Sequence, residues 1–311
     1  MRITSSPYQD DSDLRAMIDL LAVSRPADRQ DEHPSANGLY EMLSVPAQRN
    51  GVRLWRDAAA RLVAYALVDV RYCNLYWEIH PAAAGLNLED EIIGWASQYL
   101  PEGRRKWGLS VDSLTLDTSC RSDDDRIALL ESHGFQLLPE RSLHLVRRLA
   151  DPIPAPTLPL GFAIRPAAGE QEIEALVALH RAAFGTENVS SEDRLSWMRT
   201  PDYDPDLDLV AVAPDGRLAA YCFCGISREE NARTGRNEGF TDPVATHPDF
   251  QRRGLARALL LTGMHILRDR GVEWAVLGTL SDNAAMQRAA QSVGFHLAWE
   301  KLWYARPLPS I

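Results

Sequence analysis

The most informative stretch of the sequence is TDPVATHPDFQRRGLAR, residues 241–257. The apolar run that ends at Thr246 predicts a strand over 240–246, and the residues after it predict a tight turn. Gly254 opens a predicted helix over 254–270, whose apolar residues recur on one face. The first amides of a helix lack internal partners and carry the positive end of its dipole. The stretch therefore predicts a phosphate site between a strand and a helix.

The side chains of this turn suit an anion. Gly254 and Ala256 are small and leave the helix amides uncovered, while Arg252, Arg253 and Arg257 add positive charge. The chain as a whole is acidic, with 33 basic and 43 acidic residues in 311 and a net charge of -10. The alternative interpretation is a helix start that happens to contain a glycine. The strand before it and the arginines within it favour the anion site.

Outward from this turn, the second half of the chain alternates strands and helices. We expect a helix over 170–184, strands over 209–213, 218–226 and 274–277, a helix after Asp282 or Asn283, and a strand over 295–303. An antiparallel start followed by alternation predicts an α/β fold with a mixed sheet.

The two halves of the sequence resemble each other. Three short matches occur in the same order: Arg61–Tyr65 with Arg217–Tyr221, His80-Pro81 with His247-Pro248, and Gly134-Phe135 with Gly294-Phe295. They predict a duplicated domain. A proline-rich stretch between the halves predicts an extended linker. We therefore expect a first domain over 1–149, a linker over 150–160 and a second domain over 161–311.

The second half resembles the GCN5-related N-acetyltransferase (GNAT) superfamily. The residues that carry the resemblance are His247-Pro248, Gln251, Gly254 and Ala256, followed by Asn283 and Gly294-Phe295. The resemblance implies two tandem domains, each with a mixed, mostly antiparallel central sheet flanked by helices. It implies acetyl-CoA, or a related acyl-CoA, as cofactor. The residues that it assigns to cofactor binding are Val244, Ala245, Thr246, Arg252, Arg253, Gly254, Leu255, Ala256, Arg257 and Asn283.

The first half resembles the same family but has lost this site. When His80 is aligned with His247, Gly85 falls at Arg252, Asn87 at Gly254 and Glu89 at Ala256. The run Glu89-Asp90-Glu91 places three carboxylates where a pyrophosphate would bind, and like charges repel there. We expect a degenerate N-terminal copy beside a working C-terminal one.

Acyl transfer to an amine needs a base, because a primary ammonium with a pKa near 10 is no nucleophile. Asp242 is the first candidate base and Glu238 the second. On a regular strand both side chains would point to the same face as Val244. The alternative interpretation of each is a carboxylate exposed to solvent at the edge of the strand. The resemblance implies that the backbone amide of Val244 stabilises the oxyanion.

The general acid is less well defined by the sequence. The family's usual tyrosine position holds Ala290, so Tyr221 or Tyr304 would replace it, or the thiolate would leave unassisted.

The predicted function is acetyl transfer from acetyl-CoA to the primary amine of a small, cationic molecule in a ternary complex. The acids and aromatics of residues 187–208 would suit such an acceptor, with a solvated loop as the alternative. Two other functions stay open: a catalytically weak CoA-binding pseudoenzyme or sensor, and a protein N-acetyltransferase. A homodimer also stays open.

The composition limits the partners and the cellular location that we expect for the protein. The acidic balance argues against nucleic-acid and anionic-membrane partners. No N-terminal apolar segment indicates a signal peptide and no apolar run would span a bilayer, so we expect a cytoplasmic protein. Cys222 and Cys224 are interpreted as two small residues on one strand face rather than metal ligands.

Overall fold

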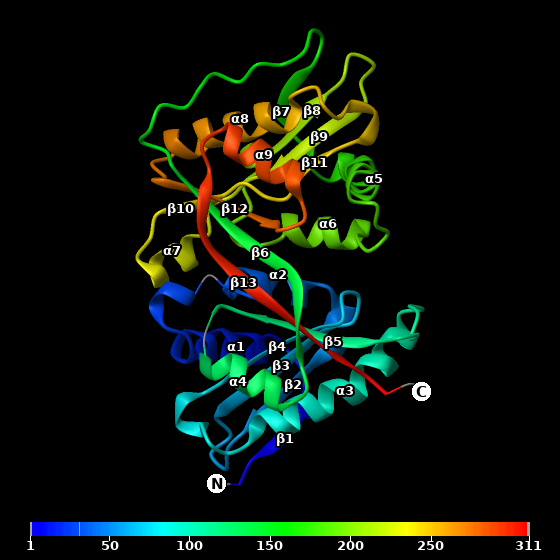
Figure 1. The fold of residues 1–311 in the computed structure, drawn as a ribbon, viewed down its shortest axis with the longest axis vertical. Helices are drawn as coiled ribbons and strands as arrows, with labels where there is room; N and C mark the ends of the chain where they lie inside the picture. The colour runs from blue at the N-terminus through cyan, green and yellow to red at the C-terminus, as the bar shows by residue number, and fades with distance from the viewer. Residues whose placement is uncertain (1, 31, 123, 310–311) are drawn as a thin grey trace. The chain divides into compact units, whose positions relative to one another are not determined.

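The computed structural model describes residues 2–309 apart from residues 31 and 123. The chain folds into two units. Unit 1 contains Met1–Pro139 and Lys301–Ile311, and unit 2 contains Glu140–Glu300. Each unit has strands in its centre and helices packed on them (Figure 1). The predicted α/β fold class is confirmed.

Unit 1 is built on an ordered run of strands. In sheet order they are β1 (Thr4–Pro7), β2 (Val52–Arg56), β3 (Leu62–Asp69), β4 (Asn74–Ile79), β5 (Thr115–Cys120) and β13 (His296–Pro307). Its helices are α1 (Asp11–Ser24), α2 (Ala36–Ser44), α3 (Leu88–Lys106) and α4 (Asp124–Ser132). The β1–β4 pairings are antiparallel, and β4 pairs with β5 in parallel.

Unit 2 has two groups of strands. One group is β11 (Val244–Thr246), β9 (Leu218–Phe223), β8 (Asp208–Val212) and β7 (Ala163–Pro166), paired antiparallel in that order. The other is β6 (Gln136–Arg148), β12 (Trp274–Leu280) and β10 (Glu238–Phe240), with β10 parallel to β12. The helices are α5 (Ile173–Phe184), α6 (Ser191–Met198), α7 (Arg228–Thr234), α8 (Leu255–Asp269) and α9 (Ala284–Ser292).

The units do not coincide with the two consecutive halves of the sequence. Strand β6, which ends the first half, pairs with β12 in unit 2 from Ser142 to Arg148. Strand β13, which ends the second half, pairs with β5 in unit 1 from Leu302 to Pro307. The division therefore falls within both strands, at 139/140 and 300/301, instead of at residues 150–160.

The proline-rich segment over 150–160 has no helix or strand, as expected, but it belongs to unit 2. Ile153 and Leu158 pack against that unit's apolar core. The Arg147 guanidinium donates to the Pro152 carbonyl at 2.8 Å, and His265 Nε2 lies 3.1 Å from the Pro154 carbonyl. The segment is thus attached along the surface of one unit.

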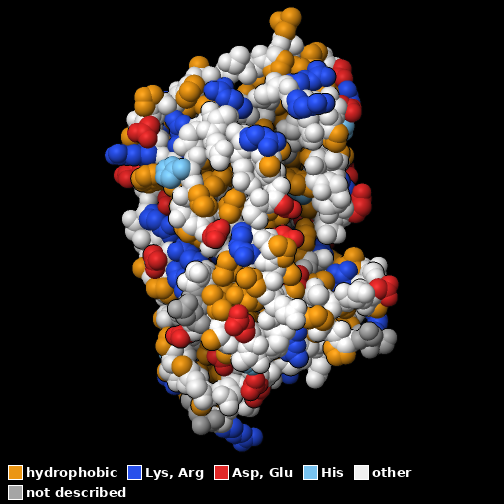
Figure 2. Space-filling model, viewed as in Figure 1, with side chains coloured by type: hydrophobic (Ala, Val, Ile, Leu, Met, Phe, Trp, Pro, Cys, Tyr) orange, Lys and Arg blue, Asp and Glu red, His pale blue; other side chains and the backbone are white. Residues whose placement is uncertain are grey.

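Each unit has its own apolar cores. In unit 2 the amphipathic helix α8 covers β8 and β9 with the fully buried Leu259, Leu260 and Met264 (Figure 1). On the face shown in Figure 2, basic and acidic side chains are interspersed. Among the described helices, none is both long and apolar enough to cross a membrane.

Candidate active site

The turn before α8 has a defined backbone geometry. His247 caps a short 3₁₀ helix, Pro248–Phe250, by accepting from the Asp249 amide at 3.2 Å. Arg252 and Gly254 then adopt positive φ values of 59° and 81°. A Cβ added at Gly254 would meet no atom within 4 Å, so the space above the helix start is open. The turn therefore leaves open space at the start of α8, where the first helix amides lack internal partners.

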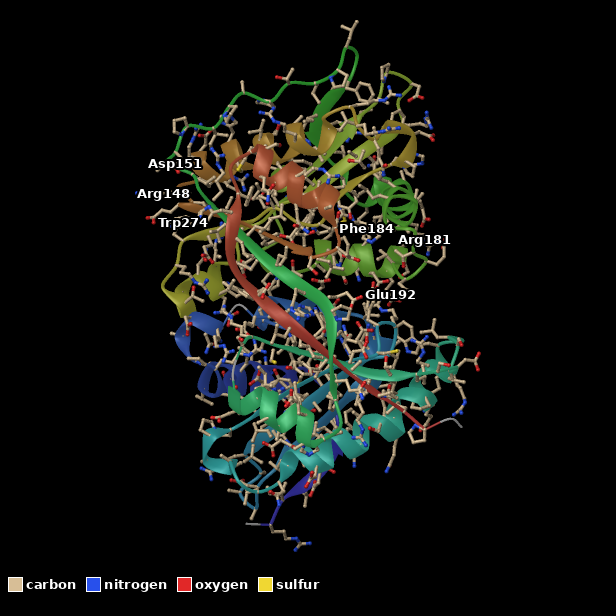
Figure 3. The ribbon with its side chains drawn as sticks, viewed as in Figure 1. Arg148, Asp151, Arg181, Phe184, Glu192 and Trp274 are labelled. Atoms are coloured by element: carbon tan, nitrogen blue, oxygen red, sulfur yellow. The ribbon has the colours of Figure 1, made fainter. Side chains whose placement is uncertain are left out.

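A cavity of about 420 Å³ lies at this helix start. It is formed by β11, the turn, the first residues of α8 and α9, and the end of α5, where Figure 3 labels Phe184. All the residues predicted to bind the cofactor line it, with the exception of Arg253. Arg253 instead lies over the Phe250 ring, at 5.6 Å from its centroid, and donates to the Asp249 carbonyl at 3.3 Å.

Sequence reasoning missed part of the lining. The additional residues are Ala183, Phe184, Phe250, Gln251, Ala285, Met286, Arg288 and Ala289. Those on α9 follow Asn283, whose side chain accepts from the Met286 amide at 3.0 Å and caps the helix. The small residues at this helix start were a usable signal, because they let the helix approach another group. Phe184 had none, since its place depends on the packing of α5.

The strands open beside this cavity. The β10–β12 pairing ends at Phe240 with Val276, and the Thr241 amide makes one further bond to the Val276 carbonyl at 2.9 Å. Strand β11 then pairs only with β9 among the described strands. The predicted continuous strand over 240–246 is thus two strands, and β11 separates from β12 where the cavity begins.

The hydrogen-bond alternation of β11 directs two amides away from β9. The Phe223 amide donates to Pro243, and the His247 amide donates to Ala219. Residues 243, 245 and 247 therefore occupy the hydrogen-bonded positions opposite β9. The amides of Val244 and Thr246 point to the other side of the strand, and both residues line the cavity. This arrangement leaves the Val244 amide able to donate to a ligand.

Asp242 lies where the strands separate, two residues before the lining residue Val244 and outside the described lining itself. Its carboxylate accepts from the Gly278 backbone, and a Cβ on Gly278 would come within 3.3 Å of its Oδ2. Burial raises the pKa of Asp242 to about 6. The carboxylate is therefore basic enough to accept a proton near neutral pH while still being ionised there.

Glu238 occupies a different environment. It is the first residue of β10, in the paired part of the sheet, and its carboxylate lies 3.4 Å from the Arg236 guanidinium. The break between β10 and β11 also means that Glu238 and Asp242 are not on one regular strand. Glu238 is held by an arginine and lies in the paired part of the sheet, so Asp242, at the separation of the strands, is the better candidate.

Neither tyrosine considered as the general acid lines the described cavity. Tyr304 is buried in the core of unit 1. Tyr221 is buried in unit 2, with its hydroxyl 2.6 Å from His180 Nδ1, and burial raises its pKa. Ala290, at the family's tyrosine position, is fully buried.

Several of the acids and aromatics of residues 187–208 make contacts within the chain. Arg194 is buried and forms an ion pair with the buried Asp208. The rings of Trp197 and Phe223 lie 5.3 and 5.2 Å from the Arg194 guanidinium, and the Tyr203 hydroxyl donates to Asp208 at 3.1 Å. The cation in this aromatic cluster is the chain's own arginine.

Comparisons with known proteins agree with this geometry. A profile described as "Acetyltransferase (GNAT) family" matches residues 173–295. The mycothiol acetyltransferase of Thermobispora bispora is 30% identical over 222 residues, which cover 70% of each chain. That of Tsukamurella paurometabola is 32% identical over 176 residues, 51% of this chain and 57% of that one. The chain thus spans little more than half the length of the latter relative.

Two solved structures share the fold over the whole chain. A GCN5-related N-acetyltransferase from Sphaerobacter thermophilus superposes with a TM-score of 0.70 at 22% identity, covering 99% of this chain and 97% of that one. A tandem GNAT protein from the clavulanic acid biosynthesis pathway gives a TM-score of 0.66 at 16% identity, covering 100% and 99%. At these identities the likeness supports the fold alone.

Proposed function

Because the chain belongs to the GNAT acetyltransferase family, we propose that unit 2 transfers an acetyl group from acetyl-CoA to the primary amine of a small molecule. The observation that carries the proposal is the cavity where β11 leaves β12 and the first amides of α8 are open. An acyl-CoA needs an anion site and room for its pantetheine arm, and the open helix start and the cavity beside it support both.

The residues at the helix start would hold the pyrophosphate. The amides around Gly254 face open space, and Arg252 and Arg257 line the same cavity. Helix-terminal amides and arginine side chains are both suited to phosphate oxygens. The backbone of Val244–Thr246 and the side of α9 near Asn283 would flank the pantetheine arm.

Asp242 and Val244 would support the chemistry. When bound, acetyl-CoA supplies the thioester that the amine attacks. The Asp242 carboxylate takes the proton of the ammonium, directly or through a water, and the Val244 amide donates to the carbonyl oxygen as it gains negative charge. A thiol with a pKa near 8.5 leaves without an acid, which fits the alanine at position 290.

The relatives indicate only the class of acceptor, a small molecule with an amine. The relatives above are named mycothiol acetyltransferases, so the amine acceptor of those enzymes is the first molecule to test. The N-terminal copy has carboxylates at the corresponding helix start, and we propose that it does not bind the cofactor there.

The test is CoA release from acetyl-CoA over a panel of small amines and lysine peptides, with acetyl-CoA binding measured separately. The proposal expects turnover with a small amine and loss of turnover, with binding retained, in Asp242→Asn. Tight acetyl-CoA binding without turnover on any amine would instead identify the CoA-binding pseudoenzyme. Turnover on peptides alone would identify a protein N-acetyltransferase.

A further inference from the structure

Strand β12 in unit 2 has one face toward α8 and one face turned away from it. Ala275 and Leu277 belong to the apolar core that α8 covers, and Leu145 of β6, which lies opposite Leu277, belongs to the same core. Side chains alternate between the two faces of a strand, so Gly278 and its partner His144 are on the face turned away from α8. Gly278 is exposed there.

The Asp242 carboxylate lies beside the same face. A Cβ built on Gly278 would come within 3.3 Å of Asp242 Oδ2, and the Gly278 backbone donates to this carboxylate. That Cβ would point away from α8, as the His144 side chain does. Strand β12 lies between β6 and β10 in the sheet. Asp242 and His144 therefore lie on opposite sides of a residue that has no side chain.

The pairing of His144 with Gly278 is of the kind that brings side chains closest. The Thr241 amide donates to the Val276 carbonyl, so the backbone groups of Val276 point toward β10. Those of Gly278, two residues on, point the same way, and its amide reaches Asp242. The pair is thus a non-hydrogen-bonded one, in which the Cα atoms are about 4.5 Å apart. The His144 side chain accordingly borders the space above Gly278.

The imidazole of His144 is held in a defined plane. Its ring stacks on the Trp299 ring, with the centroids 4.4 Å apart and the planes 11° from parallel. Both residues are half-buried, whereas Gly278 is exposed. An imidazole can donate and accept hydrogen bonds. A molecule above Gly278 would therefore meet a carboxylate on one side and an oriented imidazole on the other.

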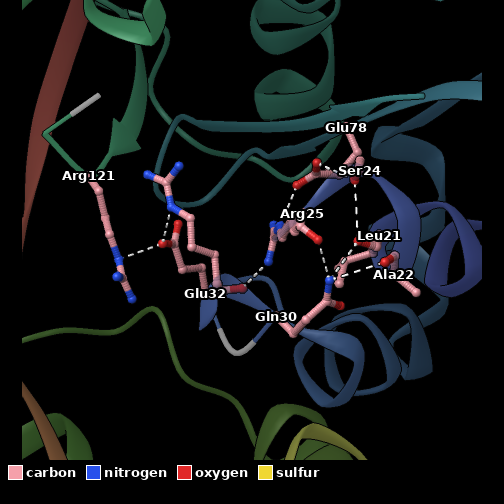
Figure 4. Close-up of polar contacts among 9 residues, drawn as sticks. Leu21, Ala22, Ser24, Arg25, Gln30, Glu32, Glu78 and Arg121 are labelled. Atoms are coloured by element: carbon pink, nitrogen blue, oxygen red, sulfur yellow. Dashed lines mark hydrogen bonds and ion pairs between the residues drawn. The ribbon is translucent and has the colours of Figure 1, made fainter. Parts of the chain in front are cut away.

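The face of unit 1 that is turned away from α3 is arranged differently. Leu75 and Trp77 of β4 belong to the core that α3 covers, so Glu78 faces away from α3. Glu78 accepts from Ser24 Oγ at 2.7 Å and from Arg25 Nε at 2.6 Å, as Figure 4 shows. This carboxylate is paired with an arginine of the chain itself. The groups that act on Asp242 are, in contrast, the surrounding protein and two backbone hydrogen bonds.

We propose that the acceptor amine occupies the space above Gly278 and that His144 forms a hydrogen bond with it, a proposal that rests on the acetyl transfer proposed above. The ammonium faces Asp242, and a polar group next to the amine faces the imidazole. The acceptor is then an amine with a hydrogen-bonding substituent close to its nitrogen. Because β6 ends the first half of the sequence, that half supplies a residue to the site of the second.

The experiment measures steady-state kinetics of the full chain at saturating acetyl-CoA, with acetyl-CoA affinity measured by calorimetry. The probe is the amine acceptor of the mycothiol acetyltransferases or, if that is not acetylated, the best amine of the panel above. His144→Phe keeps a ring against Trp299 and removes both nitrogens, and His144→Gln restores a donor and an acceptor. Gly278→Ala puts a methyl group into the proposed space. His265→Phe makes the same change on α8, which covers the other face, and is the matched control.

The proposal expects His144→Phe to raise the KM for the amine roughly tenfold, as for the loss of one hydrogen bond. His144→Gln should recover most of this loss, which a merely structural role would not explain. Gly278→Ala should lower kcat/KM for the amine, and His265→Phe should match the wild type. Retained acetyl-CoA affinity shows that each variant is folded.

Two results would overturn this proposal alone: an amine KM in His144→Phe equal to that of the wild type, or an unchanged kcat/KM in Gly278→Ala. Absence of turnover by the wild type on every amine would instead overturn the proposed function together with it.

Discussion

The turns at residues 80–88 and 247–255 share a backbone and differ in chemistry. In each a histidine caps a short 3₁₀ helix, two positive-φ residues follow, and a long helix begins at a leucine. The positive-φ pairs are Gly85 with Asn87 and Arg252 with Gly254. The backbone of this turn is therefore the same whether acidic residues follow it or not, because local capping and turn conformations hold it.

The side chains around these turns account for the difference. In unit 1 the helix begins with Glu89, Asp90 and Glu91, and two of these are used internally. Asp90 lies 2.7 Å from His133 Nε2, and Glu91 accepts from the Trp55 indole at 2.9 Å. In unit 2 the corresponding helix has no acid in its first turn. Charge at the helix start, and not the turn conformation, separates the two copies.

The largest expected difference between the two copies lies at Asp242, the candidate base. The position of Asp242 corresponds to the buried Leu75 in the first copy. We expect Asp242→Asn to lower kcat by roughly 10²–10⁴-fold, the usual contribution of a positioned acid–base group. Acetyl-CoA affinity should stay within a few-fold. Steady-state kinetics and calorimetry measure the two. The matched control is Glu238→Gln, which alters an ion-paired carboxylate; a larger loss there than at Asp242 would reverse the assignment.

The pH dependence of the wild type tests the same group. Its pKa is raised to about 6, and the ionised form is the base, so kcat/KM should rise with pH up to about 6 and then level off. The raised pKa also means that the folded chain holds a proton that the unfolded chain, near 3.8, releases. This stabilisation is present at low pH and is lost as the pH rises from about 4 to about 6.

Asp242→Asn resembles the protonated side chain, so its Tm should exceed that of the wild type at pH 8. The difference should shrink toward pH 4, because the wild-type carboxyl is then protonated as well. Thermal scans across this range measure it. A Tm difference that does not vary with pH would show that the carboxyl is not destabilised by burial.

The next expected effect is on cofactor affinity. Ala256→Glu gives unit 2 the residue that Glu89 supplies in unit 1. Two like charges about 4 Å apart repel by about 4 kcal/mol at an effective dielectric constant of 20, so affinity for acetyl-CoA should fall roughly 100-fold after partial screening. Ala256→Gln has the same shape without the charge and is the control. Equal losses in the two variants would attribute the effect to size.

A smaller effect is expected from the turn itself. Gly254→Asn copies Asn87, which adopts a φ of 53° in the first copy. Asparagine tolerates this conformation, and a Cβ here meets no neighbour, so affinity should fall only a few-fold. Gly254→Val should cost about 1–2 kcal/mol of stability, because a branched side chain does not tolerate positive φ. Equal Tm values for the two variants would contradict the shared backbone.

The turn and its helix could be predicted from the residues themselves because they depend on neighbours in the chain, whereas the predicted lining residues were assigned through the resemblance. A glycine at positive φ, a capping histidine and small residues at a helix start leave local signals. The fold class was predicted from the alternation of strands and helices, and the acetyltransferase family from the resemblance; both are confirmed. The interruption between β10 and β11 is absent from the predicted strand over 240–246, because the apolar run does not show where the strand breaks.

Contacts between distant segments were not predictable in the same way. Strands β6 and β13 have the apolar pattern of a strand, but that pattern does not specify whether β12 or β5 is the partner. The composition of the proline-rich segment predicts extended structure. It does not predict that Ile153 and Leu158 pack on unit 2. The aromatics of 187–208 likewise did not reveal Arg194 as their cation.

The smallest expected effect distinguishes two equivalent tyrosines. Tyr221 and Tyr65 end the matching segments of the two copies, and both are buried. The Tyr221 hydroxyl lies 2.6 Å from His180 Nδ1, whereas the Tyr65 hydroxyl has no hydrogen-bond partner among the described residues. Tyr221→Phe should therefore cost about 1 kcal/mol, and Tyr65→Phe should be neutral or slightly stabilising, since it removes an unsatisfied polar atom.

The same pair of variants tests the role of the acid. The Tyr221 hydroxyl is bonded to a histidine whose pKa burial and Arg194 lower to about 4, so His180 is neutral at the pH of the assay. Since the Tyr221 hydroxyl is buried and bonded to His180, kcat in Tyr221→Phe should stay within about threefold of the wild type. A loss of 100-fold would make Tyr221 the proton donor that Ala290 cannot be. Denaturant unfolding and steady-state kinetics on the two variants together separate a stability role from a catalytic one.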